Sequence, residues 1–244
     1  MASQSEASQT VEGASLAELP EPDRRAIGAV WLTRASAELT TAAVAASVAR
    51  ALIELDAVTD VVVLAARAVS DEVRHSQLCH ALAEAYLAQR LAPPRARQLE
   101  DASFGDAPRE LNRLLLVVYH SCLNEGIATA ILQENLRLAR APAVRRVLHE
   151  LLQDDIEHAR IGWAHLASSA LEAEARRHVG LALPALLRAV RNAWLVPRDS
   201  ADVDHPEHGC LPHASLAPIV EAAIESLILP GFAHVGVVVP NLAR

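Results

Sequence analysis

Two short stretches of the sequence place a carboxylate and a histidine three residues apart. They are Glu72 and His75, in the stretch DEVRH, and Asp155 and His158, in the stretch DDIEH. On an α-helix, residues at i and i+3 share a face, so each pair can direct an oxygen and a nitrogen toward one ion. Carboxylate oxygen and imidazole nitrogen together suit iron, manganese or zinc. The two stretches therefore predict a metal site.

Two further acids lie at matching distances before these pairs. Glu38 precedes Glu72 by 34 residues, and Glu125 precedes Asp155 by 30. If each segment is a helical hairpin with a tight turn, both legs are about 22–24 Å long at 1.5 Å per residue, so the paired acids meet at one height. Acids in such Ala-rich surroundings need a partner or a metal. The predicted ligands are Glu38, Glu72, His75, Glu125, Asp155 and His158, and the four acids among them are the candidate catalytic residues.

A single acid and histidine at this spacing are commonly a solvated surface pair, and the repetition in two hairpins argues against that here. Asp71 and Asp154 each precede a ligand acid. Because metal-bound histidines usually donate their other N–H to a carboxylate, we expect both acids to orient the ligand histidines. The alternative is a pair of solvated surface acids. Arg74 and Arg160, beside the motifs, are expected in surface ion pairs.

The elements that must position these residues are long helices. Pro20, Pro22 and Pro142 mark helix starts. The Pro- and Gly-containing segment 92–108 interrupts the helical pattern and is long enough to cross the length of a bundle. The expected helices are 23–54, 59–91, 109–140 and 142–174, followed by a fifth over 175–196, kinked at Pro184, and a last one over 215–229 that ends at Pro230.

The order Glu, ExxH, Glu, DxxH over four helices resembles that of the ferritin-like di-iron carboxylate superfamily, across residues 25–195. The resemblance implies an all-α, ferritin-like antiparallel four-helix bundle with a long crossover between its second and third helices, plus C-terminal helices. The implied organisation is a disordered tail over 1–20, the bundle with its fifth helix over 21–196, and a loop, helix and apolar tail over 197–244 that pack on the bundle. Asp155 departs from the usual Glu, and the shorter acid can displace one metal or favour an altered site.

The resemblance implies a di-iron oxidoreductase that activates O₂ to oxidise or hydroxylate a small organic substrate. Its cofactor would be two iron ions, with manganese as the alternative, and electrons would come from an external donor. The bridging ligands would be Glu72 and Glu125. Other functions remain open: a ferroxidase, a peroxide-detoxifying protein, or a non-catalytic scaffold whose site is degenerate at Asp155.

Several subclasses of the superfamily fit poorly. The chain has no CxxC pair of the rubrerythrin type, and Met1 is its single methionine, so a haem-binding methionine of the bacterioferritin type is missing. Tyr86 and Tyr119 are expected away from the metals, unlike the radical-forming tyrosine of ribonucleotide reductase. Leu151 stands where aromatic-amine N-oxygenases carry an additional histidine.

The composition and net charge of the chain limit which partners it is expected to bind. Of 244 residues, 52% are apolar but only 3% aromatic, which favours close-packed helices, and all basic residues are arginine. The net charge of −8 argues against nucleic acid or an anionic membrane. No transmembrane run or signal peptide is expected, and a second copy of the chain is a candidate partner. Three widely spaced cysteines, Cys79, Cys122 and Cys210, favour a reduced cytoplasmic protein.

Two features remain ambiguous in the sequence. Cys79 lies one turn after His75, where it is either a ligand or, more in keeping with its type, small apolar filler. The segment 205–213 contains three histidines and one cysteine, which raises zinc binding as an alternative to an exposed loop or lid.

Overall fold

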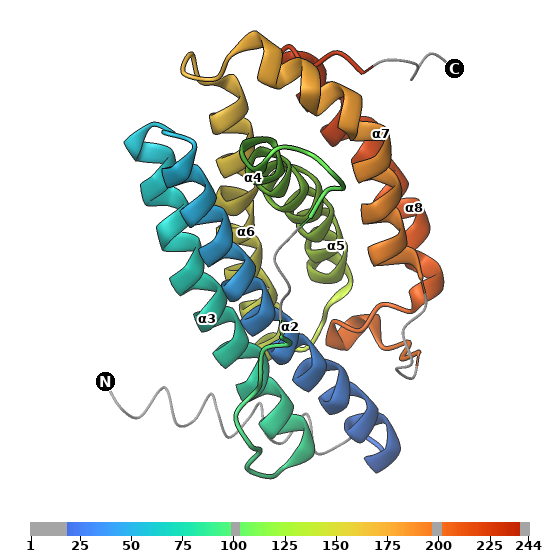
Figure 1. The fold of residues 1–244 in the computed structure, drawn as a ribbon. Helices are drawn as coiled ribbons and strands as arrows, with labels where there is room; N and C mark the ends of the chain where they lie inside the picture. The colour runs from blue at the N-terminus through green and yellow to red at the C-terminus, as the bar shows by residue number, and fades with distance from the viewer. Residues whose placement is uncertain (1–18, 99–102, 197–201, 240–244) are drawn as a thin grey trace.

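The structure, a computed structural model, describes residues 19–98, 103–196 and 202–239. Within these ranges the chain is all-α and contains no β-strand (Figure 1). Residues 1–18 of the expected N-terminal tail lie outside the described residues. The fold class predicted from the Ala- and Leu-rich composition is therefore confirmed at the level of an all-helical protein.

The first helices follow the predicted boundaries with two differences. Helix α2 spans Glu21–Glu54 and α3 spans Thr59–Leu87, so α3 ends four residues earlier than expected. Its end is set by Ala88, which adopts a left-handed conformation at φ 51° and cannot continue the helix. Helix α6 begins at Pro142, as predicted, but ends at Ala167 rather than at 174.

The early end of α6 has an identifiable cause. The guanidinium group of Arg176 donates hydrogen bonds to the carbonyl oxygens of Leu166, Ser168 and Leu171 at 2.9, 2.7 and 2.8 Å. The first bond satisfies a carbonyl that the end of α6 leaves without an intrahelical partner, and the other two hold the turn that follows it. The turn is thus held from α7, which spans Ala173–Leu195 and contains Pro184.

The third predicted helix is one helical rod with a change of winding in its middle. Helix α4, Arg109–Val117, passes into a π-helical segment, η1, Val118–Asn124, and then into α5, Glu125–Leu138. Together these segments cover the predicted range 109–140 except for its last two residues. The π-helical turn immediately before Glu125 was not predicted.

Four helical rods surround a common interior: α2, α3, the α4–η1–α5 rod and α6 (Figure 1). Helix α2 packs along α3, α3 packs on α6, and α6 packs on α5. Helix α3 ends at the lower end of the molecule and α4 begins in its upper part, so the two ends of the segment that joins them lie far apart (Figure 1). Residues 99–102 of this segment lie outside the described residues.

The C-terminal helices cover one side of these rods. Helix α8, Leu216–Ala223, continues through the π-helical segment η4, Ile224–Ile228, into α9, Leu229–His234. With α7 they pack against the α4–η1–α5 rod. The last helix extends five residues beyond the predicted end at 229, because Pro230 stands in the first turn of α9, where a missing N–H is tolerated.

The His-containing segment before α8 is neither an exposed loop nor a lid. The carbonyl oxygen of Glu207 accepts backbone N–H groups from Arg140 and Ala141 at 2.8 and 3.1 Å. Trp31 Nε1 donates to the carbonyl of His208 at 3.2 Å. Among the residues that the structure describes, no metal-holding group includes these histidines. The segment instead ties the C-terminal part of the chain to α2 and to the α5–α6 turn.

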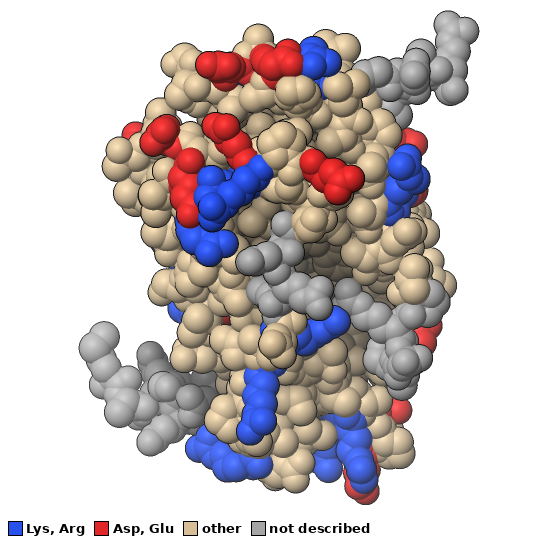
Figure 2. All heavy atoms as spheres, in the orientation of Figure 1, with Lys and Arg blue, Asp and Glu red and all other residues tan. Residues whose placement is uncertain are grey.

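Three helical stretches are long and apolar enough to cross a membrane, judged by length and composition alone: Glu21–Glu54, Arg109–Leu138 and His213–His234. The expectation that the chain has no such run was therefore wrong. The chain's many Ala, Val and Leu residues raise the hydropathy of these stretches, two of which also carry Glu38 and Glu125. On the face shown in Figure 2, broad areas of uncharged residues, drawn in tan, separate the charged side chains.

Candidate metal centre

The six residues predicted as metal ligands come together between the four rods, in two groups. Ligand atoms of the first group lie within 4.8 Å of one another, as do those of the second. The first group is Glu72, Glu125, Asp155 and His158, and the second is Glu38, Glu72 and His75. Glu72 belongs to both groups, which is the arrangement required of a ligand shared by two ions.

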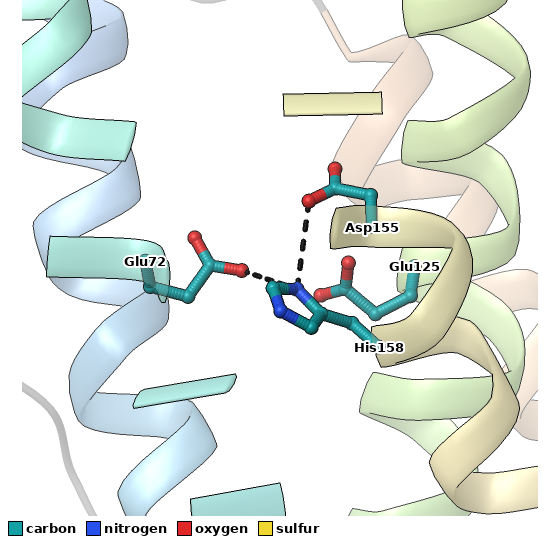
Figure 3. A group of neighbouring side chains, drawn as sticks. All are labelled: Glu72, Glu125, Asp155 and His158. Carbon is teal, nitrogen blue, oxygen red and sulfur yellow. Dashed lines mark ion pairs between the residues drawn. The ribbon is translucent and has the colours of Figure 1, made fainter. Parts of the chain in front are cut away.

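Glu72 lies between the two histidines. Its Oε1 is 3.0 Å from Nδ1 of His158, and its Oε2 is 3.5 Å from Nδ1 of His75. Asp155 Oδ1 also faces both rings, at 3.5 Å from His158 Nδ1 and 3.7 Å from His75 Nδ1. Figure 3 shows Glu72 reaching from α3 toward Asp155 and His158 of α6, with Glu125 of α5 beside them. Asp155, although shorter than the usual Glu, therefore still lies between the two histidines. Glu125, which was expected to bridge two metals, belongs to only one of the two ligand groups.

The donor atoms fit a divalent cation. Glu72 Oε2, His75 Nδ1, Asp155 Oδ1 and His158 Nδ1 are buried and have no hydrogen-bond partner of good geometry. Buried polar atoms in proteins are nearly always partnered, so four orphaned atoms converging on one space require an explanation. A metal ion between them supplies it, since oxygen and imidazole nitrogen are the ligands such ions take.

The electrostatics of the cluster indicate the same missing charge. Burial, with the charges of Glu72 and Asp155, raises the pKa of Glu38 to about 8. Burial likewise raises the pKa of Glu125 well above its ordinary value. Burial opposes ionisation of Glu72 too, but the rings of His158 and His75, at 3.0 and 3.5 Å, outweigh it and lower its pKa to about 2. Without a cation, protons must offset the crowded acids, and a bound metal would replace them.

Asp71 and Asp154 lie beside the two histidines, as the sequence predicts, but each acid faces the histidine of the other helix. His75 Nε2, on α3, is 3.0 Å from Oδ2 of Asp154 on α6. His158 Nε2, on α6, is 3.5 Å from Oδ2 of Asp71 on α3. Asp154 thus bonds the outer nitrogen of His75, whereas Asp71 faces the outer nitrogen of His158 at ion-pair distance without a hydrogen bond. This turns both Nδ1 atoms toward the interior and fixes the ring orientation.

Arg74 does more than form the expected surface ion pair. Its guanidinium group bonds Asp154 and Glu150, and lies 3.4 Å from Asp71. It therefore links the two acids that orient the histidines. Arg160 forms the expected exposed pair with Glu157, at 2.6 Å.

His120 is a site residue that the sequence interpretation missed. Its Nε2 lies 3.3 Å from Oε1 of Glu125, and only 7% of the residue is exposed. In a regular α-helix, residues five apart point about 140° away from each other, given 3.6 residues per turn. The π-helical winding of η1 bonds i to i+5 and brings them to one face. Nothing in the local sequence signals this change of winding.

A small cavity adjoins the cluster. Its polar wall is formed by Glu72, Glu125, His120 and His158, and its apolar wall is formed by Ala45, Val48, Ala65, Ala68 and Ile161. It has space for roughly one water molecule. In this conformation the cavity is therefore too small for an organic molecule.

The remaining candidates lie outside the cluster. Cys79 is fully buried in an apolar core with Trp31, and burial raises the pKa of its thiol well above its ordinary value, in keeping with filler. Tyr119 packs against Phe104, with ring centroids 6.1 Å apart. Leu151 is buried in the apolar core.

Comparisons with protein-family models, with curated proteins and with solved structures find no match to this chain. The site described above therefore rests on the geometry of the chain's own residues.

Proposed function

We propose that this chain is a ferritin-like four-helix-bundle oxidoreductase that holds two iron ions and activates O₂ to oxidise or hydroxylate a small organic substrate. The observation that carries the proposal is the pair of ligand groups that share Glu72; all their members except the partly buried Glu38 are buried between the four helices. One ion would bind Glu38, Glu72 and His75, and the other would bind Glu72, Glu125, Asp155 and His158. Electrons would come from a separate donor.

Two ferrous ions side by side can bind O₂ and supply electrons to it. The protein's part is to hold their ligands in fixed positions and to exclude water. Asp154 bonds the outer nitrogen of His75, Asp71 lies 3.5 Å from that of His158, and Arg74 bonds both acids. The apolar wall of the cavity, with Ala45 and Ile161, limits the space beside Glu72 to about one water molecule. His120 orients the carboxylate of Glu125.

A second function is favoured by one observation, the size of the cavity. A space for about one water admits O₂ or hydrogen peroxide but no organic molecule. Iron oxidation or peroxide disposal, with manganese as the alternative metal, needs no larger pocket. In that case the chain would have no organic substrate.

The test is the reaction of the Fe(II)-loaded protein with O₂, prepared anaerobically. Rapid O₂ consumption with an oxo-bridged diferric absorption in the near ultraviolet supports the di-iron reading. Product formation from an organic substrate, sustained by a chemical reductant, distinguishes an oxygenase from a ferroxidase. Rapid peroxide breakdown by the Mn(II)-loaded protein, without O₂ consumption by the iron form, would replace the proposal with the second function. The matched control is Glu157→Gln, which alters an exposed acid beside His158.

A further inference from the structure

Tyr86 is a fully buried tyrosine that lies outside the metal cluster. It stands in the last turns of α3, and its hydroxyl group is 2.7 Å from Nδ1 of His208, in the segment before α8. The two rings meet edge to face, with centroids 5.7 Å apart and planes at 87°. A buried phenol needs a hydrogen-bond partner. Here the partner is a base, which can take a proton as well as a hydrogen bond.

The proton lies on the phenol. Burial raises the pKa of Tyr86 well above its ordinary value, so its O–H bond stays intact at neutral pH. Burial lowers the pKa of His208, so the imidazole is neutral. Tyr86 therefore donates to Nδ1, and the other ring nitrogen, Nε2, carries the hydrogen of the imidazole.

A carboxylate stands behind the histidine. His208 Nε2 is 3.9 Å from Oε1 of Glu207, whose side chain is 43% exposed. Burial would raise the pKa of Glu207, but its own backbone N–H and the hydrogen bond from His205 outweigh this and lower it. Exposure thus increases from Tyr86 to His208 to Glu207. In this order the three side chains are a proton donor, a neutral base and an anion.

The innermost of these residues, Tyr86, is connected to the metal centre along α3. Tyr86 follows His75 by eleven residues, or about 16 Å along the helix. Cys79 and Ala83 lie between them at helical spacing on the same face, and both are fully buried. Packed protein, with no solvent-exposed side chain on this strip, therefore separates Tyr86 from the centre.

A neighbouring aromatic residue, Trp31, is less suited to lose an electron. The guanidinium carbon of Arg34 lies 4.4 Å from the centroid of its ring, and a fixed positive charge there opposes the formation of a second one. Its indole N–H donates to the carbonyl oxygen of His208, which cannot accept a proton. Tyr86, by contrast, has a base within hydrogen-bond distance of its hydroxyl group.

We propose that Tyr86, His208 and Glu207 form a proton-coupled redox relay between the metal centre and the surface at residues 202–213. This rests on the proposed function, because the oxidant is the iron centre after its reaction with O₂. Tyr86 loses one electron to that centre, which is reduced by one electron. The O–H bond of Tyr86 breaks, and its proton forms an N–H bond with Nδ1 of His208. Glu207 stabilises the resulting imidazolium. In the opposite direction, a one-electron donor at the surface restores the phenol as His208 returns the proton.

The first test removes the iron chemistry. In the full chain with Zn(II) in place of iron, a photosensitised one-electron oxidant generates tyrosyl radical, read by electron paramagnetic resonance and transient absorption. The chain has two tyrosines, so Tyr119→Phe is the matched control. We expect the wild type and Tyr119→Phe to give the same radical, and Tyr86→Phe to lose it. His208→Gln keeps a hydrogen-bonding group without a base, and should slow radical formation about a hundredfold, at the low end of what a positioned base contributes. Glu207→Gln should shorten the radical lifetime.

The relay is overturned if the radical forms on Tyr119, or if His208→Gln leaves its rate and its solvent deuterium effect unchanged. Because His208→Gln retains Tyr86, this outcome stays readable even if Tyr86→Phe fails to fold. The second test repeats the measurement with Fe(II) and O₂. A radical in both tests supports the relay and the iron function together. A radical in the first test alone supports the proton-coupled chemistry of Tyr86 and counts against the proposed iron function.

Discussion

The shared position of Glu72 predicts a graded loss of metal stabilisation across single ligand variants. A metal that binds only the folded state stabilises it by about 2.7 kcal/mol at a concentration 100 times its dissociation constant. Two ions would therefore contribute about 5 kcal/mol, and at about 2–4 °C per kcal/mol for a chain of this size the midpoint temperature should rise by about 10–20 °C.

Single substitutions of the ligands should each remove a different share of this rise in midpoint temperature. Glu72→Ala removes a ligand from both groups, so we expect a residual rise of at most about 3 °C, the effect of less than one intact site. Glu38→Ala leaves the group of Glu125, Asp155 and His158 with Glu72 complete, so about half of the rise should remain. Glu125→Ala should likewise keep about half. Each variant is compared with its own metal-free form, which removes its effect on packing.

Differential scanning calorimetry of chelator-treated protein, with and without Mn(II), measures the rise for each chain. Glu157→Gln, an exposed acid next to His158, is the control and should keep the full rise. The reasoning is refuted if Glu72→Ala keeps half of the rise while Glu38→Ala abolishes it. Equal losses in all three ligand variants would show that one ion, not two, is bound.

Three further predictions follow from the same geometry. The free energy of unfolding of the metal-free protein should fall as pH rises from 4.5 to about 8, because Glu38 keeps its proton in the folded state over this interval and loses it in the unfolded state. Bound Mn(II) should suppress this fall. Urea unfolding across pH, with and without metal, measures both effects. Gly162→Ala should destabilise the protein by about 1–3 kcal/mol, because the added Cβ would lie 2.4 Å from Sγ of Cys122, while Gly126→Ala, whose nearest contact is 3.5 Å, should cost less in the same urea experiment. Ala45→Leu should fill the cavity and slow O₂ consumption at unchanged metal content, measured with an oxygen electrode.

The local part of the site could be predicted from sequence. An acid and a histidine at i and i+3 share a helix face whatever surrounds them, as Glu72 and His75 do. Helical rise alone then brings Glu38 level with Glu72 when a short turn joins the two helices. For the same reason Asp71 and Asp154 could be assigned to the ligand histidines, although it could not be foreseen that each acid faces the histidine of the other helix.

The parts that could not be predicted depend on distant contacts. His120 reaches Glu125 only because the rod is wound as a π-helix before that residue. The end of α6 is set by Arg176, from the next helix. The packing of His208 on Tyr86 joins residues 122 positions apart, which no local pattern encodes.

The central claim is that two ions bind between these helices and share Glu72, and metal stoichiometry tests it most directly. The protein is loaded anaerobically with Fe(II), freed of unbound metal and analysed for iron per chain, beside Glu72→Ala and Glu157→Gln. We predict about two iron ions per chain in the wild type and in Glu157→Gln, and less than one in Glu72→Ala. Wild-type protein that retains no more iron than Glu72→Ala would contradict the account.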